Sequence, residues 1–213
     1  LKIAQGNDEP EELRGKAAIS LGPALETADL EGFFDPDDIL ITEEVFKRVR
    51  DSLRELYEDA GVPKLVRRRV LEASVRAPQD WHLSAVRAAF DDDDADWRLT
   101  AIFAMRWLGG FDEQILDALS SDDDAICCEA IIAAGNHELD AAWKPLLRMI
   151  DSEHTAKPLL LAAIDAIATI HPKHAGPVLV ELMDSTDDEE VAGAASEAMM
   201  DADAFSGSGL FDD

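Results

Sequence analysis

An internal repeat constrains the fold of this chain more than any other feature of its sequence. Six ten-residue segments align without gaps, and their starts are spaced by 53, 31, 29, 33 and 32 residues. The segments are 13–22, 66–75, 97–106, 126–135, 159–168 and 191–200. Position one is large and apolar, and positions five and eight are mostly alanine, a spacing that places all three on one helix face. Small residues at positions five and eight allow a neighbouring helix to approach closely.

A second apolar-periodic stretch precedes each segment after the first. These stretches are 44–57, 81–90, 113–119, 141–150 and 175–183, and short acidic turns follow four of them, at 91–94, 121–124, 151–154 and 184–190. Ser and Asp are favoured N-cap residues, and negative charge stabilises a helix N-terminus. Each unit is therefore predicted to be helix, acidic turn, helix. Neither helix can bury its apolar face alone, so stability must come from stacked neighbours.

The predicted fold is all-α, an α-α superhelix of about six helix pairs. Hydrophobic residues make up 47% of the chain and aromatic residues only 6%, with Ala and Leu prominent, which favours helices over sheets. One array is expected over residues 1–203. An acidic loop insertion near 26–42 accounts for the long first spacing, and residues 204–213 are predicted to be a flexible acidic tail.

The pattern resembles HEAT repeats, in the short form found in bacterial repeat proteins and in phycobilisome-lyase-type proteins. An acidic turn, an apolar residue and Arg precede a small-residue helix that ends in Leu-Gly; this is clearest at 13–22 and recurs at 66–67 and 96–98. The resemblance implies a solenoid whose second helices line a concave surface that grips a partner. It also implies a structural column of Arg14, Arg67 and Arg98 that pairs with turn aspartates.

The charge of the chain excludes several partners. There are 46 Asp and Glu against 19 Lys and Arg, a net charge of −27, and such a field repels phosphate backbones and anionic membranes. No apolar run is long enough for a transmembrane helix, and residues 1–10 lack the pattern of a signal peptide, so we expect a cytoplasmic protein. Asp exceeds Glu by 28 to 18 and Lys numbers only seven, which suggests as a hypothesis adaptation to a high-salt cytoplasm.

A basic island interrupts this acidic sequence. Residues 45–76 carry nine positive and five negative side chains. The island has two interpretations. Glu72 lies four residues after Arg68 and three after Arg69, so the arginines could pair internally. Alternatively, they bind a protein or peptide that carries acidic groups, because guanidinium binds carboxylates and phosphates in a bidentate manner. The candidate partner-binding residues are Lys64, Arg68, Arg69, Arg76 and, after an acidic turn, Trp97.

Catalytic and metal-binding patterns are weak. The run Asp91–Asp94 fails as a calcium loop, because Asp96 stands where Gly is needed and Ile102 where Glu is needed. Cys127 and Cys128 are adjacent, a spacing that strains a disulfide, and could instead be reactive or attach a bilin. We expect no cofactor, no metal and no catalytic residue. The leading hypothesis is a non-catalytic protein-interaction scaffold that binds on the concave face; the alternative is a HEAT-like enzyme or chromophore lyase.

Overall fold

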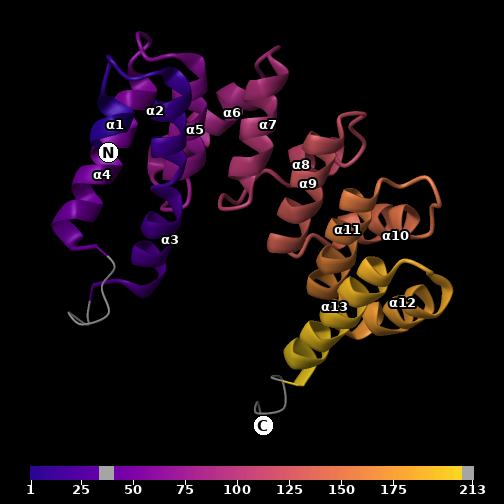
Figure 1. The fold of residues 1–213 in the computed structure, drawn as a ribbon. Helices are drawn as coiled ribbons and strands as arrows, with labels where there is room; N and C mark the ends of the chain where they lie inside the picture. The colour runs from indigo at the N-terminus through magenta and orange to yellow at the C-terminus, as the bar shows by residue number, and fades with distance from the viewer. Residues whose placement is uncertain (34–40, 208–213) are drawn as a thin grey trace. The chain divides into compact units, whose positions relative to one another are not determined.

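Helices make up every regular element that a computed structural model of the protein describes, over residues 1–33 and 41–207 (Figure 1). The helices are α1 (Lys2–Gln5), α2 (Glu11–Ile19), α3 (Gly22–Glu31), α4 (Glu43–Glu58), α5 (Lys64–Ser74), α6 (Asp80–Phe90), α7 (Ala95–Met105), α8 (Asp112–Ala118), α9 (Asp124–Asn136), η1 (Asp140–Ala142), α10 (Trp143–Ile150), α11 (Lys157–Ile170), α12 (Pro172–Ser185) and α13 (Glu189–Gly207). The chain divides into two compact units, Leu1–Leu108 and Gly109–Asp213. The prediction of an all-α helical fold is confirmed.

The first unit stacks the helices of three repeat segments. Segments 13–22, 66–75 and 97–106 fall on α2, α5 and α7, and α5 packs against both α2 and α7. The preceding helices pack against these: α1 on α2, α4 on α5, and α6 on α7 (Figure 1). The helix–turn–helix units predicted from the sequence are therefore present in this unit.

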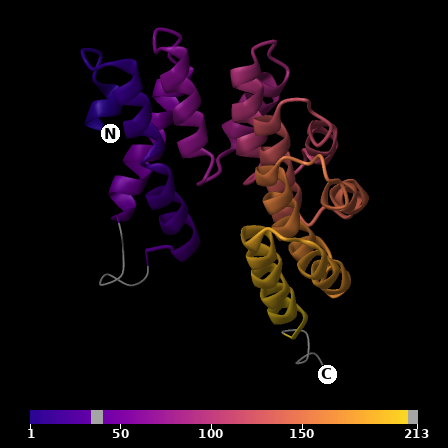
Figure 2. The same ribbon diagram turned by 45° about the vertical axis from the view of Figure 1, so that its right-hand side comes forward.

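The second unit repeats the arrangement with α9, α11 and α13, which carry segments 126–135, 159–168 and 191–200. In this unit α11 packs against both α9 and α13, and the first helices α8, α10 and α12 pack on them (Figure 2). Close approach is seen at Ala166, position eight of its segment, where the neighbouring helix presents Gly135, position ten of its own segment. A Cβ atom placed on Gly135 of α9 would lie 3.2 Å from the Cα and Cβ atoms of Ala166 on α11, so these helices meet backbone to backbone.

The register of the buried face is as predicted in five segments and differs in the first. At position five, Val70, Ala101, Ala130, Ala163 and Ala195 are fully buried. On α2, however, Leu13 is 42% exposed, and the buried residues are Arg14, Gly15 and Ala18. The face is turned by one residue because the Nε atom of Arg14 donates a hydrogen bond to the carbonyl oxygen of Ala4 on α1, at 3.0 Å.

The predicted loop insertion near 26–42 is wrong over residues 26–31, which belong to α3. Pro23 in the first turn suits a helix start, and Leu25 and Ala28 are buried three residues apart as α3 packs on α5. The helix ends at Gly32, whose φ of 72° favours glycine. Residues 34–40 of the predicted insertion lie outside the described residues.

The C-terminal prediction is also corrected in part, because α13 extends to Gly207 rather than ending near residue 203. The remainder of the predicted tail, 208–213, lies outside the described residues. Over the residues that the structure describes, none of the helices combines the length and the apolar character needed to cross a membrane.

Candidate functional site

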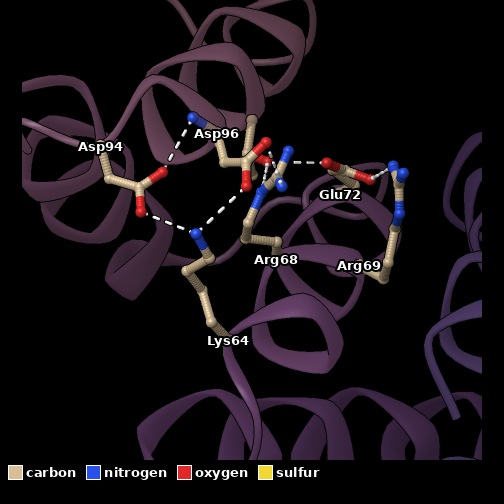
Figure 3. Close-up of polar contacts among 7 residues, drawn as sticks. Lys64, Arg68, Arg69, Glu72, Asp94 and Asp96 are labelled. Atoms are coloured by element: carbon tan, nitrogen blue, oxygen red, sulfur yellow. Dashed lines mark hydrogen bonds and ion pairs between the residues drawn. The ribbon is translucent and has the colours of Figure 1, made fainter. Parts of the chain in front are cut away.

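The candidate binding residues of the basic island include Arg68, a side chain that the fold buries. Arg68 on α5 is only 6% exposed. Its Nε donates to the hydroxyl of Thr100 on α7 at 2.9 Å, and its Nη1 lies 2.9 Å from Oδ1 of Asp96 (Figure 3). Thr100 in turn donates to Oε1 of the buried Glu72 at 2.7 Å, and Glu72 accepts from Arg69 through Oε2. The buried charges of Arg68 and Glu72 therefore have polar partners on α5 and on α7, and buried charges require such partners.

Lys64 at the start of α5 extends this network at the surface. Its Nζ lies 2.7 Å from Oδ2 of Asp94 and 3.1 Å from Oδ2 of Asp96 (Figure 3). The hydrogen bond to Asp94 raises the pKa of Lys64, and the ammonium lowers the pKa of both carboxyl groups. Asp94 also caps α7, because its Oδ1 accepts from the backbone N–H of Asp96 at 2.9 Å. The aspartate run thus caps a helix and pairs with α5.

Arg76 belongs to a different set of contacts. Its Nη1 lies 2.8 Å from Oε2 of Glu26 on α3, and the indole N–H of Trp107 donates to the other oxygen of Glu26 at 2.8 Å. The guanidinium group of Arg76 lies over the Trp107 ring, 4.8 Å from its centroid. Arg76 therefore already has an acidic partner within the first unit, and the same is true of Lys64, Arg68 and Arg69.

Trp97 is half-buried and packs edge-on to Tyr57, with the ring centroids 6.2 Å apart. The guanidinium of Arg67 lies 5.6 Å from the Trp97 centroid and 5.3 Å from that of Tyr57, and its Nε donates to the Tyr57 carbonyl oxygen at 2.8 Å. Trp97 is thus part of an aromatic contact between α4 and α7, with Arg67 held against it.

The implied column of Arg14, Arg67 and Arg98 does not supply the expected pairs with turn aspartates. Arg14 bonds the carbonyl of Ala4 and Arg67 that of Tyr57, while the exposed Arg98 lies over the Phe90 ring at 5.6 Å. The turn aspartates pair instead with Arg68 and Lys64, because Arg67 is rotated about 100° around the helix axis from Arg68.

The ion pair that recurs in both units joins a lysine at the start of a repeat helix to the acidic turn before the next repeat helix. Lys157 begins α11 as Lys64 begins α5, and its Nζ lies 2.8 Å from Oδ2 of Asp188, which caps α13, and also pairs with Glu190. Both lysines lie two residues before the first position of their own repeat segment. The acidic partners of each lysine lie three residues and one residue before the first position of the next segment. These lysine pairs were not predicted from the sequence, although a lysine that recurs at that place, with a D-x-D/E turn about 30 residues later, signals them.

The second unit contains a groove that the sequence analysis also missed. It has a volume of about 470 Å³ and lies between α9 and α11. Its lining is mostly apolar: Cys128, Ile132, Gly135, Asn136, Pro158, Leu161, Ala162, Asp165, Ala166 and Thr169. Four of these residues occupy positions three and seven of their repeat segments, beside the buried positions one, five and eight. The repeat pattern therefore places these four residues on the same side of α9 and of α11.

The same two positions are closed in one segment of the first unit, 66–75. Positions three and seven of segment 66–75 are Arg68 and Glu72, which are buried in the network with Thr100. In segments 126–135 and 159–168 of the second unit the corresponding pairs are Cys128 with Ile132 and Leu161 with Asp165, and these line the groove. Segment 97–106 of the first unit carries the apolar Leu99 and Phe103 at these positions, both half-buried, so the contrast holds between single segments and not between whole units.

Negative charge surrounds the polar edge of the groove. Partial burial raises the pKa of Asp165, and the charges of Asp201 and Glu197 on α13 raise it further. The whole second unit, residues 109–213, has 23 Asp and Glu against four Lys and Arg.

The two cysteines lie in different surroundings. Cys127 is buried and its thiol donates to the Leu119 carbonyl oxygen at 3.4 Å, and burial raises its pKa. Cys128 is half-buried and lines the groove. Among the side chains of residues 1–33 and 41–202, no three His, Cys, Asp or Glu residues are placed to hold a metal ion.

Comparison with known proteins supports the fold. No family model and no curated protein matches the chain. Among solved structures, a crystal structure of an engineered protein is similar with a TM-score of 0.50 at 17% identity, and the match covers 95% of this chain and 96% of that one. At such identity the likeness bears on architecture alone. Together with the stacked helix pairs, it defines the chain as an all-α helical repeat protein.

Proposed function

We propose that this chain is a non-catalytic interaction scaffold of the HEAT-like type, and that it binds a polypeptide segment in the groove between α9 and α11. The single observation that carries the proposal is that groove, open on two successive repeat helices. The HEAT-like assignment is supported by the aligned segments and by the helix–turn–helix unit of about 31 residues.

The size and lining of the groove suit a bound segment. Ligand sites have volumes of roughly 300–1,000 Å³, with apolar walls and a few polar groups that orient the ligand. The groove has about 470 Å³, with Ile132, Leu161 and Ala162 as apolar lining and Asp165 as a charged group. Repeat proteins commonly bind partners along surfaces formed by successive repeats, and an apolar groove between helices accepts an amphipathic segment.

The basic island is less suited to this role than the sequence suggested. Arg68 is buried and bonded to Thr100 and Asp96, and Arg76 is held by Glu26. A partner would have to displace these bonds and leave acidic groups such as Glu72 without a partner, which is costly for buried charges. We therefore place the binding site in the second unit.

The test introduces bulk into the groove. Ala162→Phe fills it, and Val180→Phe adds the same ring at an exposed apolar site on α12 that does not line it. Peptides selected on the wild-type chain from a random display library are measured by fluorescence anisotropy. We expect Ala162→Phe to weaken binding about tenfold or more, a change of about 1.4 kcal/mol, and Val180→Phe to leave binding unchanged. Equal binding to all three proteins would place the site elsewhere.

One observation supports the alternative, an enzyme or chromophore lyase: the Cys128 thiol lines the groove. Visible absorbance that remains with the denatured chain after incubation with a bilin, and that is absent from Cys128→Ser, would favour it over the scaffold function. Loss of absorbance on denaturation of the wild type would show that no covalent bond forms.

A further inference from the structure

We propose that the segment bound in the groove is cationic and amphipathic, with apolar side chains toward α9 and a Lys or Arg that pairs with Asp165. This inference rests on the proposed function and adds the chemical class of the partner. Three features of the second unit support it: the length of the groove, the distribution of charge around it, and the place of its carboxylate.

The groove runs along two turns of each helix. On α9 its lining includes Cys128, Ile132 and Asn136, and on α11 it includes Leu161, Asp165 and Thr169, each set spaced by four residues. Eight residues of α-helix extend about 12 Å. A segment of two to three helical turns, whose ends contact Leu161 and Thr169, thus has its middle opposite Asp165.

Charge complementarity selects a cation at that middle position. Asp165 is more than a third exposed, and Glu197 and Asp201, which lie one turn apart on α13, add negative charge beside it. No lysine or arginine is among the described residues that line the groove. This unit has four basic side chains, and one of them, Lys157 at the start of α11, is already paired with Asp188 and Glu190.

A cationic side chain would therefore meet several carboxylates whose mutual repulsion it relieves, while a carboxylate on the partner would increase that repulsion. The apolar lining on α9 supplies the remaining contact. Since apolar contact alone is not selective, Asp165 is the residue that determines which segments bind.

The experiment compares two helical peptides of equal length and identical Leu and Ala face, one with Lys at the central edge and one with Gln. Anisotropy is measured on the full chain, on Asp165→Asn, and on Asp184→Asn, which removes the same charge from an exposed site on α12 outside the groove. We expect the Lys peptide to bind the wild type about tenfold more tightly than the Gln peptide. This preference should disappear in Asp165→Asn and persist in Asp184→Asn.

The thiol of Cys128 gives an independent measure of groove occupancy. Bound peptide should slow its alkylation, with Cys128→Ser as the control for reaction at the buried Cys127. If both peptides protect the thiol and bind equally, the groove binds polypeptides but the cationic inference is overturned. If neither peptide protects it, the proposed function fails as well.

Two further outcomes would also overturn the cationic inference. One is a Lys preference that survives in Asp165→Asn but not at higher salt, which is attraction to the acidic surface in general. The other is protection of Cys128 by concentration-dependent dimerisation without peptide, seen by analytical ultracentrifugation, which would make a second copy of the chain the occupant.

Discussion

A buried histidine provides a quantitative test of the first unit. His82 on α6 is completely buried. Its Nδ1 accepts the backbone N–H of Gln79 at 2.8 Å, and its Nε2 lies 3.0 Å from the hydroxyl of Ser74. Because Nδ1 accepts, the neutral ring carries its proton on Nε2 and donates it to Ser74. Burial, with a smaller contribution from the positive charge of Arg50, lowers the pKa of His82 to about 4.

The pKa shift sets the size and the sign of the effect. In the unfolded chain the pKa of His82 is about 6.5, so below that pH the unfolded state binds the proton first and stability falls. The loss is about 1.36 kcal/mol per pH unit and continues until the folded pKa near 4 is reached. Integrated over this window, His82 costs about 2.5 kcal/mol of stability by about pH 4.5, relative to neutral pH.

The assay compares urea unfolding of the wild type and His82→Gln at about pH 7.5 and about pH 4.5, followed by tryptophan fluorescence, since Trp81 stacks on His82 with ring centroids 3.9 Å apart. Gln keeps donor and acceptor groups but does not titrate in this range. The carboxylates are common to both proteins, so the stability difference isolates His82. We expect the wild type to lose about 2.5 kcal/mol relative to the variant on acidification. A difference that does not change with pH would refute this account.

Three further predictions concern the ion pairs and the charge. Thr100→Val should destabilise the chain by roughly 1–3 kcal/mol in urea unfolding, because it removes the hydroxyl between the buried Arg68 and Glu72; a change within error would mean that the network adds nothing to stability. Lys157→Met should leave the urea midpoint of unfolding nearly unchanged, because its pair with Asp188 is exposed and screened by solvent, and a clear fall in the midpoint would contradict this expectation. If the acidity is an adaptation to salt, helicity measured by circular dichroism should rise from low to molar salt as repulsion is screened, and a flat signal would reject the hypothesis.

The helices were predictable from the sequence because each segment carries its packing information locally. A large residue at position one and small residues at five and eight define a face without reference to any partner helix. The first segment departs from this because Arg14, expected to pair with a turn aspartate, instead reaches the carbonyl of Ala4. That bond depends on where α1 lies, which periodicity within 13–22 does not encode.

The candidate site was less predictable because its charges pair over long separations. Lys64 pairs with Asp94, and Arg68 bonds to Thr100, 30 and 32 residues away. A charge count over 45–76 finds an excess of positive residues, but their partners lie in the next repeat. The interpretation of internal pairing was correct for Arg69 and Glu72. The other pair considered within α5, Arg68 with Glu72, is joined through the hydroxyl of Thr100 on the next repeat helix.

Positions three and seven of the repeat segments show how one architecture can separate stability from binding. In segment 66–75 of the first unit Arg68 and Glu72 occupy these positions, and their charges are buried only because Thr100 and neighbouring residues bond to them. Such a surface is closed, since a ligand would leave buried charges unpaired. In the second unit Ile132 and Leu161 stand at equivalent positions and face an open groove. Leaving apolar surface in contact with water is unfavourable unless a partner covers it. A partner that covers the apolar lining of this groove would therefore remove that surface from water, a gain that the closed network around Arg68 and Glu72 does not offer.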